Sequence, residues 1–430
     1  MIYDIAIVGG GTAGCAAAYI AGKLGLKSII IEKNIHLGGT ITSGLVIPIM
    51  QSGENQINTD FYNDLVLELK AVNGQITYQG NQGWFNPELL KIVLDNMMSK
   101  VGVDILFNTM VTDVSIENKK INRLYLNNNL LSVCNDKLYC QNKMLSVYID
   151  AKYVIDSTGN CEIGKFSNCE FLENHENIQP PSLRFIMENV NVKEFADWIC
   201  LLDSNRDVTT SEYIGNQCHC STAYTWDSAK KWALAPLFED AVKNKVLKDT
   251  DRNYFQVFSI AGMSSAIAFN CPRIIDDIDF DDGISISNAI MSARAAILRL
   301  SNFCKLYLKG FENSYISNIA DMLGVRASRR IKGKYVYTIE DLKSGKKFEH
   351  PVLISNYPVD VHSKDKNSST LEVVKDYQLP IESLMSKDVD NLFVAGRCLS
   401  ADAMAQGALR VQASCFSMGE GVAKYIKSII

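Results

Sequence analysis

A glycine-rich segment near the start of the chain has the residue types and spacing that hold a dinucleotide. Gly9, Gly11 and Gly14 satisfy the pattern GxGxxG, between a short apolar run and a small-residue helical pattern. In a strand-turn-helix unit the first glycine permits the tight turn, the second lets backbone approach a pyrophosphate, and the third lets the helix pack on the strand. Thr12 and Ala13 open the helix, whose N-terminus offers unpaired N–H groups to the phosphates.

A carboxylate follows the next apolar run. Glu32 stands 18 residues beyond Gly14, at the end of the predicted second strand. A carboxylate at this place accepts hydrogen bonds from both ribose hydroxyls of an adenosine, and it disfavours the 2'-phosphate of NADP. NAD and FAD share this fingerprint, so the strand-helix-strand unit by itself leaves both dinucleotides open.

Three other segments favour the longer cofactor, FAD. Lys33 is followed by a second glycine-rich loop with Gly38, Gly39 and Thr40, where backbone can lie along an extended ligand. Residues 154–159 form a strand that ends in a turn at the nucleotide site. Residues 391–397 end another strand in Gly-Arg and lead towards a helix whose N-terminus can face an anionic flavin ring. No second strand-linked GxGxxG is present, so a built-in NAD(P)H domain is not expected.

Hydrophobic periodicity predicts the elements that must position these segments. Strands are predicted at residues 5–8, 28–31 and 391–395, and a β-meander followed by a return strand at 103–155. Helices are predicted at residues 12–24, 85–100, 287–307, 312–323 and 408–426. The fold class is therefore α/β, with a Rossmann-like FAD-binding domain of the three-layer ββα type. We expect residues 1–165 and 375–430 to form that domain, and 166–374 to form an inserted α+β substrate domain.

The sequence resembles the FAD-dependent oxidoreductases of the two-domain, glutathione-reductase-like fold, in particular the bacterial family that bears only that general name. The resemblance covers nearly the whole chain, and its marks are DIAIVGGGTAGCAAA from Asp4, IEKNIHLGGT from Ile31, YVIDSTGN from Tyr153, LGVRASRRIKGKY from Leu323, YPVDVH from Tyr357, YQLPIESL from Tyr377 and NLFVAGRCLSA from Asn391. It implies FAD as the cofactor, and it implies FAD contacts at Gly9, Gly11, Gly14, Glu32, Gly39, Val111 beside the adenine, Thr158, Gly159, Gly396 and Arg397.

Hydride transfer to a flavin calls for a base and for cations that hold or polarise the substrate. His362, one of five histidines, is the predicted general base, with a structural or surface histidine as the alternative. Arg329 and Arg330 share helical spacing with Arg326 and are predicted to form an anion clamp, unless they are salt-bridged structural residues. Arg410 is a further candidate for contact with the flavin or a substrate carboxylate.

Cysteines offer weaker candidates. Cys398 follows the Gly-Arg pair and is more simply explained by packing than by redox chemistry. Cys218-His219-Cys220 lacks the second ligand pair of a zinc signature, so no metal site is predicted. The twelve cysteines are scattered and often lie in apolar segments, which is typical of reduced thiols in a cytoplasmic protein.

Composition limits the partners. Hydrophobic residues make up 47% of the chain, the net charge is −5, and no run of Lys or Arg is present. These values exclude a disordered protein and give no footprint for nucleic acid. The uncharged stretch at 5–22 contains three consecutive glycines and follows no basic residue, so neither a membrane span nor a signal peptide is expected.

We therefore predict an enzyme that acts on a small-molecule substrate, with an electron donor or acceptor and an oligomeric state that the sequence leaves open. Two alternatives remain at this point. One is a flavin-dependent tRNA-modifying enzyme, which the acidic balance opposes. The other is a FAD-binding sensor or assembly protein without catalysis.

Overall fold

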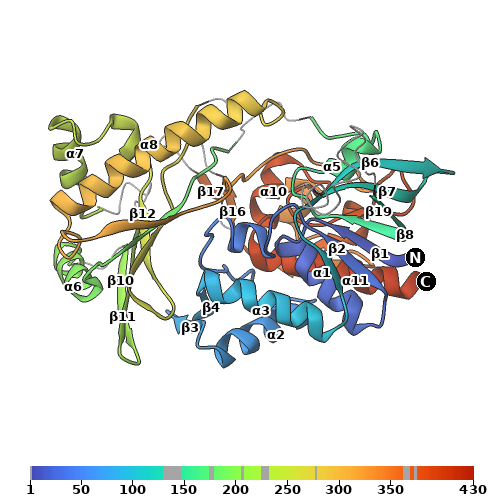
Figure 1. Ribbon diagram of the computed structural model, residues 1–430, viewed down its shortest axis with the longest axis horizontal. Coiled ribbons are helices and arrows are strands. Elements are labelled where there is room, and N and C mark those ends of the chain that lie inside the picture. The colour runs from blue at the N-terminus through green and yellow to red at the C-terminus, as the bar shows by residue number, and fades with distance from the viewer. Residues whose placement is uncertain are drawn as a thin grey trace, which may run out of the picture.

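The computed structural model describes residues 2–128, 147–173, 179–204, 208–223, 232–276, 278–361, 369–371 and 375–430. Within them, two large sheets lie at opposite ends of an elongated molecule (Figure 1). The first sheet belongs to the predicted FAD-binding domain, and the second to the predicted substrate domain. None of the described helices is both long enough and apolar enough to cross a membrane.

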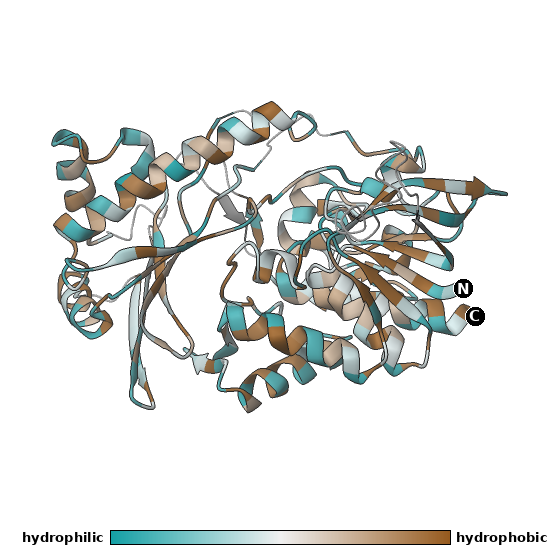
Figure 2. Ribbon diagram, viewed as in Figure 1, coloured by the Kyte–Doolittle hydropathy of each residue, from teal (hydrophilic) through white to brown (hydrophobic). Residues whose placement is uncertain are grey.

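The first sheet is mainly parallel and is ordered β5-β2-β1-β8-β7-β6, with β19 also paired to β8. Its parallel strands are β1 (Ile2–Val8), β2 (Ser28–Ile31), β5 (Asp104–Leu106), β8 (Val147–Asp156) and β19 (Leu392–Val394). Strands β6 (Thr109–Glu117) and β7 (Lys120–Asn128) form the antiparallel meander that the Asn and Asp punctuation predicted. Strand β2 is buried throughout and β1 is buried from Ile5 to Val8, and the strands of this sheet are mostly hydrophobic in Figure 2, as expected for a parallel sheet covered on both faces.

Helices cover this sheet. Helix α1 (Thr12–Lys23) packs along α11 (Gln412–Ile429), and their alanines and glycines allow close approach: a Cβ at Gly419 would lie 2.1 Å from the carbonyl oxygen of Ala13. Helices α2 (Asp60–Ala71) and α3 (Pro87–Lys100) lie beside them. Asn86 begins α3 by accepting hydrogen bonds from two backbone N–H groups of its first turn, and Pro87 suits the first helical position. Because β1 and β19 both pair with β8 in parallel, the segments that follow these three strands meet at one edge of the sheet.

The second sheet is antiparallel and is ordered β10-β11-β12-β13-β9-β14. Its strands are β9 (Phe185–Glu188), β10 (Thr209–Ile214), β11 (Gln217–Ala223), β12 (Gln256–Ile260), β13 (Met263–Phe269) and β14 (Tyr315–Ile319). Helices α6 (Val192–Leu202), α7 (Ala235–Lys243) and α8 (Gly283–Tyr307) pack on it around a cluster of phenylalanines. All of these strands fall inside the predicted insertion at 166–374.

Smaller elements connect the two ends of the molecule. They are β3 (Gln75–Tyr78) paired with β4 (Asn81–Phe85), β15 (Pro351–Ser355) paired with β18 (Tyr377–Pro380), β16 (Val359–Val361) paired with β17 (Ser369–Leu371), and the short helices α5 (Glu162–Phe166), α9 (Ile339–Ser344) and α10 (Ala403–Leu409).

One predicted helix is wrong, and another is interrupted near its start. The segment 312–323 contains strand β14, because Ile316 and Ile319 pair with β9 at the edge of the second sheet, and this tertiary pairing overrides the apparent helical spacing. The predicted helix 408–426 is divided into α10 and α11. Val411 takes an extended conformation (φ −68°, ψ 153°) and forms the N-cap of α11, so the chain turns at Arg410. That break brings the N-terminus of α11 to the edge where the glycine loops lie.

Candidate functional site

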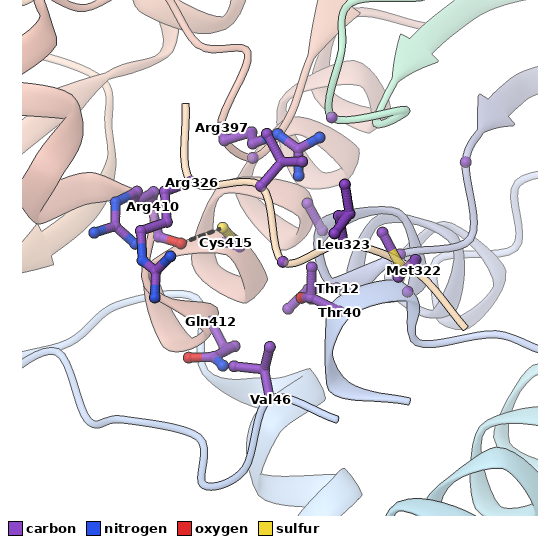
Figure 3. Close-up of a pocket in the computed structure, with 18 of the residues that line it drawn as sticks. Thr12, Thr40, Val46, Met322, Leu323, Arg326, Arg397, Arg410, Gln412 and Cys415 are labelled. Atoms are coloured by element: carbon purple, nitrogen blue, oxygen red, sulfur yellow. Dashed lines mark hydrogen bonds between the residues drawn. The ribbon is translucent and has the colours of Figure 1, made fainter. Parts of the chain in front are cut away.

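A cavity of about 650 Å³ lies where the two ends of the molecule meet. We call one part the nucleotide half; it is lined by residues that include Gly9, Gly11, Thr12, Ala13, Glu32, Lys33, Gly39, Thr40, Val111, Thr158, Gly159, Gly396 and Arg397. We call the other part the cap half; it is lined by residues that include Arg184, Tyr254, Gln256, Asn270, Arg326, Tyr357, Asp360 and Arg410. Figure 3 shows Thr12 and Thr40 facing Arg326, Arg410 and Gln412 across this space.

The three glycines of the first loop have three different surroundings. Gly9 has a φ of +97°, and a Cβ there would lie 2.7 Å from the carbonyl oxygen of Ser157. A Cβ at Gly14 would lie 2.0 Å from the carbonyl oxygen of Gly9, so Gly14 is behind the loop, where helix packs on strand. A Cβ at Gly11, in contrast, meets nothing closer than the Cα of Gly39 at 4.0 Å. Gly11 is therefore not required by protein packing, and the space beside it belongs to the cavity.

The predicted carboxylate lies at the end of β2 with its geometry fixed by backbone. Glu32 is 5% exposed and lines the cavity. Its Oε2 accepts a hydrogen bond from the N–H of Gly10 at 2.6 Å, and its Oε1 accepts one from the N–H of Asn34 at 2.8 Å. Each carboxylate oxygen keeps a second lone pair, so the group can still accept two hydroxyl donors.

The second glycine loop faces the first. Gly39 has a φ of +54°, and a Cβ there would lie 2.9 Å from the Cα of Gly11. Thr12 and Thr40 lie with their Oγ1 atoms 3.3 Å apart across the gap. Gly38 does not line the cavity. Its φ of +99° serves the turn, and a Cβ there would meet the side chain of Thr42 at 2.6 Å.

The two segments that return to the nucleotide site are locked together. Gly159 has a φ of +77°, and a Cβ there would lie 2.9 Å from the guanidinium carbon of Arg397. Arg397 donates from Nη2 to Oδ1 of Asn160 at 2.7 Å and from Nε to Oγ of Ser328 at 3.2 Å. The sequence singled out both Gly159 and Arg397, and the structure brings them together at the edge of the cavity.

Asp156 is a site residue that the sequence analysis passed over. It is fully buried at the end of β8, and its carboxylate accepts hydrogen bonds from the N–H groups of Thr158, Ile163 and Gly164. Burial raises the pKa of Asp156 above its ordinary value, while these hydrogen bonds oppose that rise. Asp156 therefore ties the turn at Thr158 to α5 and positions the loop that lines the cavity.

The helix N-termini and the carboxylate at this cavity are of the kinds that FAD requires. The first turn of α1 begins at the cavity with no side-chain cap, so its N–H groups are available to a pyrophosphate. Glu32 would hold the adenosine ribose, with Val111 nearby on β6. The N-terminus of α11 also lies at the cavity without a side-chain cap, and Gln412 lines it. Such an end favours negative charge on a flavin ring.

The predicted clamp of Arg329 and Arg330 is not at the cavity, and the helical spacing behind it is wrong. Residues 325–330 form no helix, so the three arginines do not share a face. Arg329 pairs with Asp281 and donates to the carbonyl of Asn160 at 3.2 Å. Arg330 donates to the carbonyls of Ala401 at 2.7 Å and Glu173 at 3.1 Å. Arg326, the third member of that group, does line the cavity.

The other candidates from the sequence are Arg410, His362 and Cys398. Arg410, at the end of α10, lines the cavity and donates from Nη2 to Oε1 of Gln179 at 2.9 Å. His362 lies outside the described residues, so its role stays a prediction. Cys398 is fully buried and does not line the cavity, whereas Cys415 does, with its Sγ 3.5 Å from the carbonyl oxygen of Arg410 (Figure 3).

Sequence reasoning missed most of the cap half. Tyr254 donates to Oε1 of Gln256 at 2.9 Å, and Asn270 donates to the same oxygen at 2.8 Å, which makes a small polar network in the wall of the cavity. Arg184 stands immediately before β9. These are single polar residues at the ends of strands, without spacing or composition that would distinguish them from ordinary surface positions.

The chain matches a family of known proteins along nearly its whole length. The model of the family described as FAD dependent oxidoreductase matches residues 4–427. Thiamine thiazole synthase of Pyrococcus horikoshii is 28% identical over 159 residues, and that of Methanococcus vannielii is 28% identical over 167 residues. Each match covers 36% of this chain, and 57% and 56% of the respective relatives, so the chain spans little more than half their length.

Two solved structures match over nearly the whole of this chain. A geranylgeranyl bacteriochlorophyll reductase-like protein from Thermoplasma acidophilum is 15% identical with a TM-score of 0.47, over 99% of this chain and 78% of that one. The p-nitrophenol 4-monooxygenase of Pseudomonas putida is 10% identical with a TM-score of 0.46, over 100% of this chain and 80% of that one.

Proposed function

Because the chain belongs to the FAD dependent oxidoreductase family and its cofactor is FAD, we propose that it transfers a hydride between a small organic substrate and the flavin. The observation that carries the proposal is the continuity of the cavity. It begins at the glycine loops of the nucleotide half and extends without a break to the polar side chains of the cap half. A substrate in the cap half would therefore lie beside the cofactor.

FAD supplies the group that accepts or donates the hydride. The protein's own residues have the remaining tasks of binding the substrate, excluding water and moving a proton. Phe280, Ile286 and Ile290 line part of the cavity with apolar side chains, which would help to exclude water around a bound substrate. The polar network of Tyr254, Gln256 and Asn270 offers fixed hydrogen-bonding groups to a substrate.

We assign the proton-accepting role to Asp360 among the described residues. Asp360 lies on β16 and lines the cavity with its side chain 21% exposed. Its Oδ2 is 3.8 Å from Nη2 of Arg410, so the carboxylate is held in place by a cation and still reaches the open space. His362, two residues later in the chain, remains the alternative that the sequence proposed.

The test begins with the visible spectrum of the purified protein, which should show bound flavin. The protein is then mixed without oxygen with a panel of donors that covers hydroxy acids, amino acids, alcohols and amines. An oxidoreductase bleaches with at least one donor, and the bleached flavin reoxidises with an acceptor. A protein that holds FAD but is bleached by no donor, and whose chemically reduced flavin is reoxidised by no organic acceptor, would be a sensor or assembly protein.

A further inference from the structure

Three arginines gather in the cap half of the cavity although they are far apart in the chain. We call Arg184, Arg326 and Arg410 the arginine triad. Arg184 precedes β9, Arg326 follows β14 in an irregular segment, and Arg410 ends α10. All three line the same cavity, and Figure 3 shows Arg326 beside Arg410. Arg184 is 9% exposed and Arg326 is 8% exposed, so these charges are largely withdrawn from water.

Neutral groups hold the triad in place. Arg184 donates from Nη1 to the carbonyl of Leu45 at 3.2 Å. Arg326 donates to the carbonyl of Pro180 at 2.5 Å and to Oγ of Ser182 at 3.1 Å. Arg410 donates to Gln179, and to the backbone carbonyl of Asp360 at 3.0 Å. Such acceptors orient a guanidinium group but do not neutralise its charge.

The positive charge of the triad exceeds the negative charge around it. Asp360 is 3.8 Å from Arg410, but within the described part of the chain no salt bridge reaches Arg184 or Arg326. Arg273 adds a further guanidinium, stacked on the ring of Tyr254 with its Cζ 3.7 Å from the ring centroid. Buried like charges are costly, and a bound anion relieves both the burial and the repulsion.

Burial lowers the pKa values of Arg184 and Arg326, and neighbouring guanidinium groups add to this decrease at Arg326. Burial, followed by the positive charges of Arg273, Arg410 and Arg184, lowers the pKa of Arg326 below its ordinary value. Burial lowers the pKa of Arg184 to about 10. A guanidinium group stays protonated in proteins, so the cap half presents an electropositive wall. Nε of Arg184 and Nε of Arg410 are buried and have no hydrogen-bond partner among the described residues.

The phosphates of FAD do not account for this wall. The pyrophosphate is expected at the N-terminus of α1, beside Gly11, whereas Arg326 and Arg410 are bonded to residues 179–182 and to Asp360. We propose that the arginine triad binds the carboxylate group of the substrate and so selects an organic acid. The proposal rests on the proposed function, since it names the substrate class for that same site.

A carboxylate suits the triad better than a phosphate. Each guanidinium has five N–H donors, and the protein already uses part of that set on Arg326 and Arg410. Guanidinium groups bind carboxylates and phosphates alike in bidentate geometry, so the apolar lining of the cavity decides between them. Phe280, Ile286 and Ile290 also provide apolar surface in the same cavity for a carbon skeleton.

The test uses binding, which needs no turnover. FAD-loaded protein is titrated with benzoate and succinate, with benzamide and succinamide as neutral isosteres, and with inorganic phosphate, while the flavin absorbance is recorded. We expect at least one carboxylate to perturb the spectrum in a saturable manner, with an affinity at least tenfold above that of its amide. Equal affinity for acid and amide, no saturable response to either acid, or tighter binding of phosphate than of both acids would overturn the assignment.

Variants locate the effect. Arg184→Met and Arg410→Met should each weaken carboxylate binding by about ten- to a hundredfold, the size of a lost hydrogen bond to a charged group, and should retain FAD. Arg294→Met, at an exposed position on α8, is the matched control and should bind as the unaltered protein does. Unchanged carboxylate affinity in both triad variants would overturn the proposal. If a methionine variant fails to fold, Arg184→Lys and Arg410→Lys preserve the charge and should still lose affinity, because lysine lacks the planar fork.

The two proposals fail separately. If carboxylates bind to the wild-type protein but none of them bleaches the flavin, the triad assignment stands and hydride transfer from an organic acid is ruled out. Bleaching by neutral donors only, with no carboxylate binding, would leave the oxidoreductase function standing and remove the triad assignment.

Discussion

The nucleotide half of the cavity is made of backbone and small residues, whereas the cap half is made of long side chains that come from separate elements. In the nucleotide half, Gly11 leaves open space and Glu32 is fixed by the N–H groups of Gly10 and Asn34. In the cap half, Arg184, Arg326 and Arg410 reach the cavity from the position before a strand, from an irregular segment and from a helix end. A site built from backbone should fail abruptly when an atom is added, and a site built from side chains should weaken by degrees.

The largest effect is expected from Gly11→Val. Its backbone is extended (φ −75°, ψ −168°), which valine accepts, and a Cβ there meets no protein atom within 3.9 Å, so the fold should survive. The side chain would instead fill the space that the pyrophosphate needs, and FAD binding should be lost. The flavin content of the purified protein and its reconstitution with FAD measure this.

Variants at two other glycines serve as comparisons for Gly11→Val. Gly14→Ala would place a Cβ 2.0 Å from a backbone oxygen and should lower the yield of folded protein, and Gly283→Ala, where nothing lies within 4 Å, should change neither fold nor flavin. A Gly11→Val protein with full flavin would show that the first loop does not hold the pyrophosphate.

The next effect concerns the proton acceptor. Asp360→Asn and His362→Ala should both retain FAD, because Asp360 belongs to the cap half and His362 lies outside the nucleotide-binding segments of the sequence. The variant that removes the base should slow anaerobic bleaching by roughly 10²- to 10⁴-fold, the usual size of a lost general acid or base. Asp113→Asn and His350→Ala, at exposed positions, are the controls. Wild-type bleaching rates in both test variants would remove these residues from the chemistry.

Glu32→Ala should have a smaller effect within the nucleotide half. Loss of the ribose acceptor should weaken FAD by roughly 1.5 to 3 kcal/mol, the range for hydrogen bonds to a charged group. The N–H groups of Gly10 and Asn34 also lose their acceptor, so thermal stability should fall as well. Titration of apo-protein with FAD gives the affinity, and Glu117→Ala, an exposed carboxylate on β6, provides the control. Unchanged FAD affinity would refute the ribose contact.

The smallest effect should appear in the second sheet, outside the nucleotide half. His219 on β11 is 1% exposed, and burial lowers its pKa to about 4, against a weaker opposing influence of Glu212. The unfolded chain, with a histidine pKa near 6.5, then binds more protons than the folded chain between those pH values, so stability falls as pH decreases from about 6.5 towards 4. Between pH 7 and pH 5.5 the loss should be about 1 kcal/mol.

Thermal midpoints across that pH range measure the effect, with flavin content as the second reading. His219→Gln should flatten the decline relative to the unaltered protein, and FAD binding should not change at neutral pH. An identical pH profile in the variant would show that His219 does not contribute to acid sensitivity.

These two halves also differ in how far they could be predicted from the sequence. Strands β1 and β2, helix α1, and the positions of Gly9, Gly11, Gly14 and Glu32 follow from local rules, because a turn, a helix start and a strand end each have preferred residues at short spacing. The return of Gly159 and Arg397 to the same edge followed from parallel strands that end in glycine turns.

The cap half could not be predicted in the same way. Arg329 and Arg330 are predicted as a clamp because three arginines stand close in sequence, yet neither lines the cavity, whereas Arg326 lines it from a segment that is not helical. Arg184 and Asn270 have no neighbouring pattern at all. Strand β14 was read as a helix because its pairing with β9 depends on residues far away in the chain.

The sequence by itself determined the positions of the first glycine loop, of the carboxylate at the end of β2 and of the parallel strands beside them, since each depends on the conformational limits of a few consecutive residues. Only the tertiary structure decided which cations face the substrate. A long side chain acquires its role from the direction in which its element crosses the others, and whether a guanidinium group lines the cavity or lies behind its wall depends on packing that no short stretch of sequence encodes.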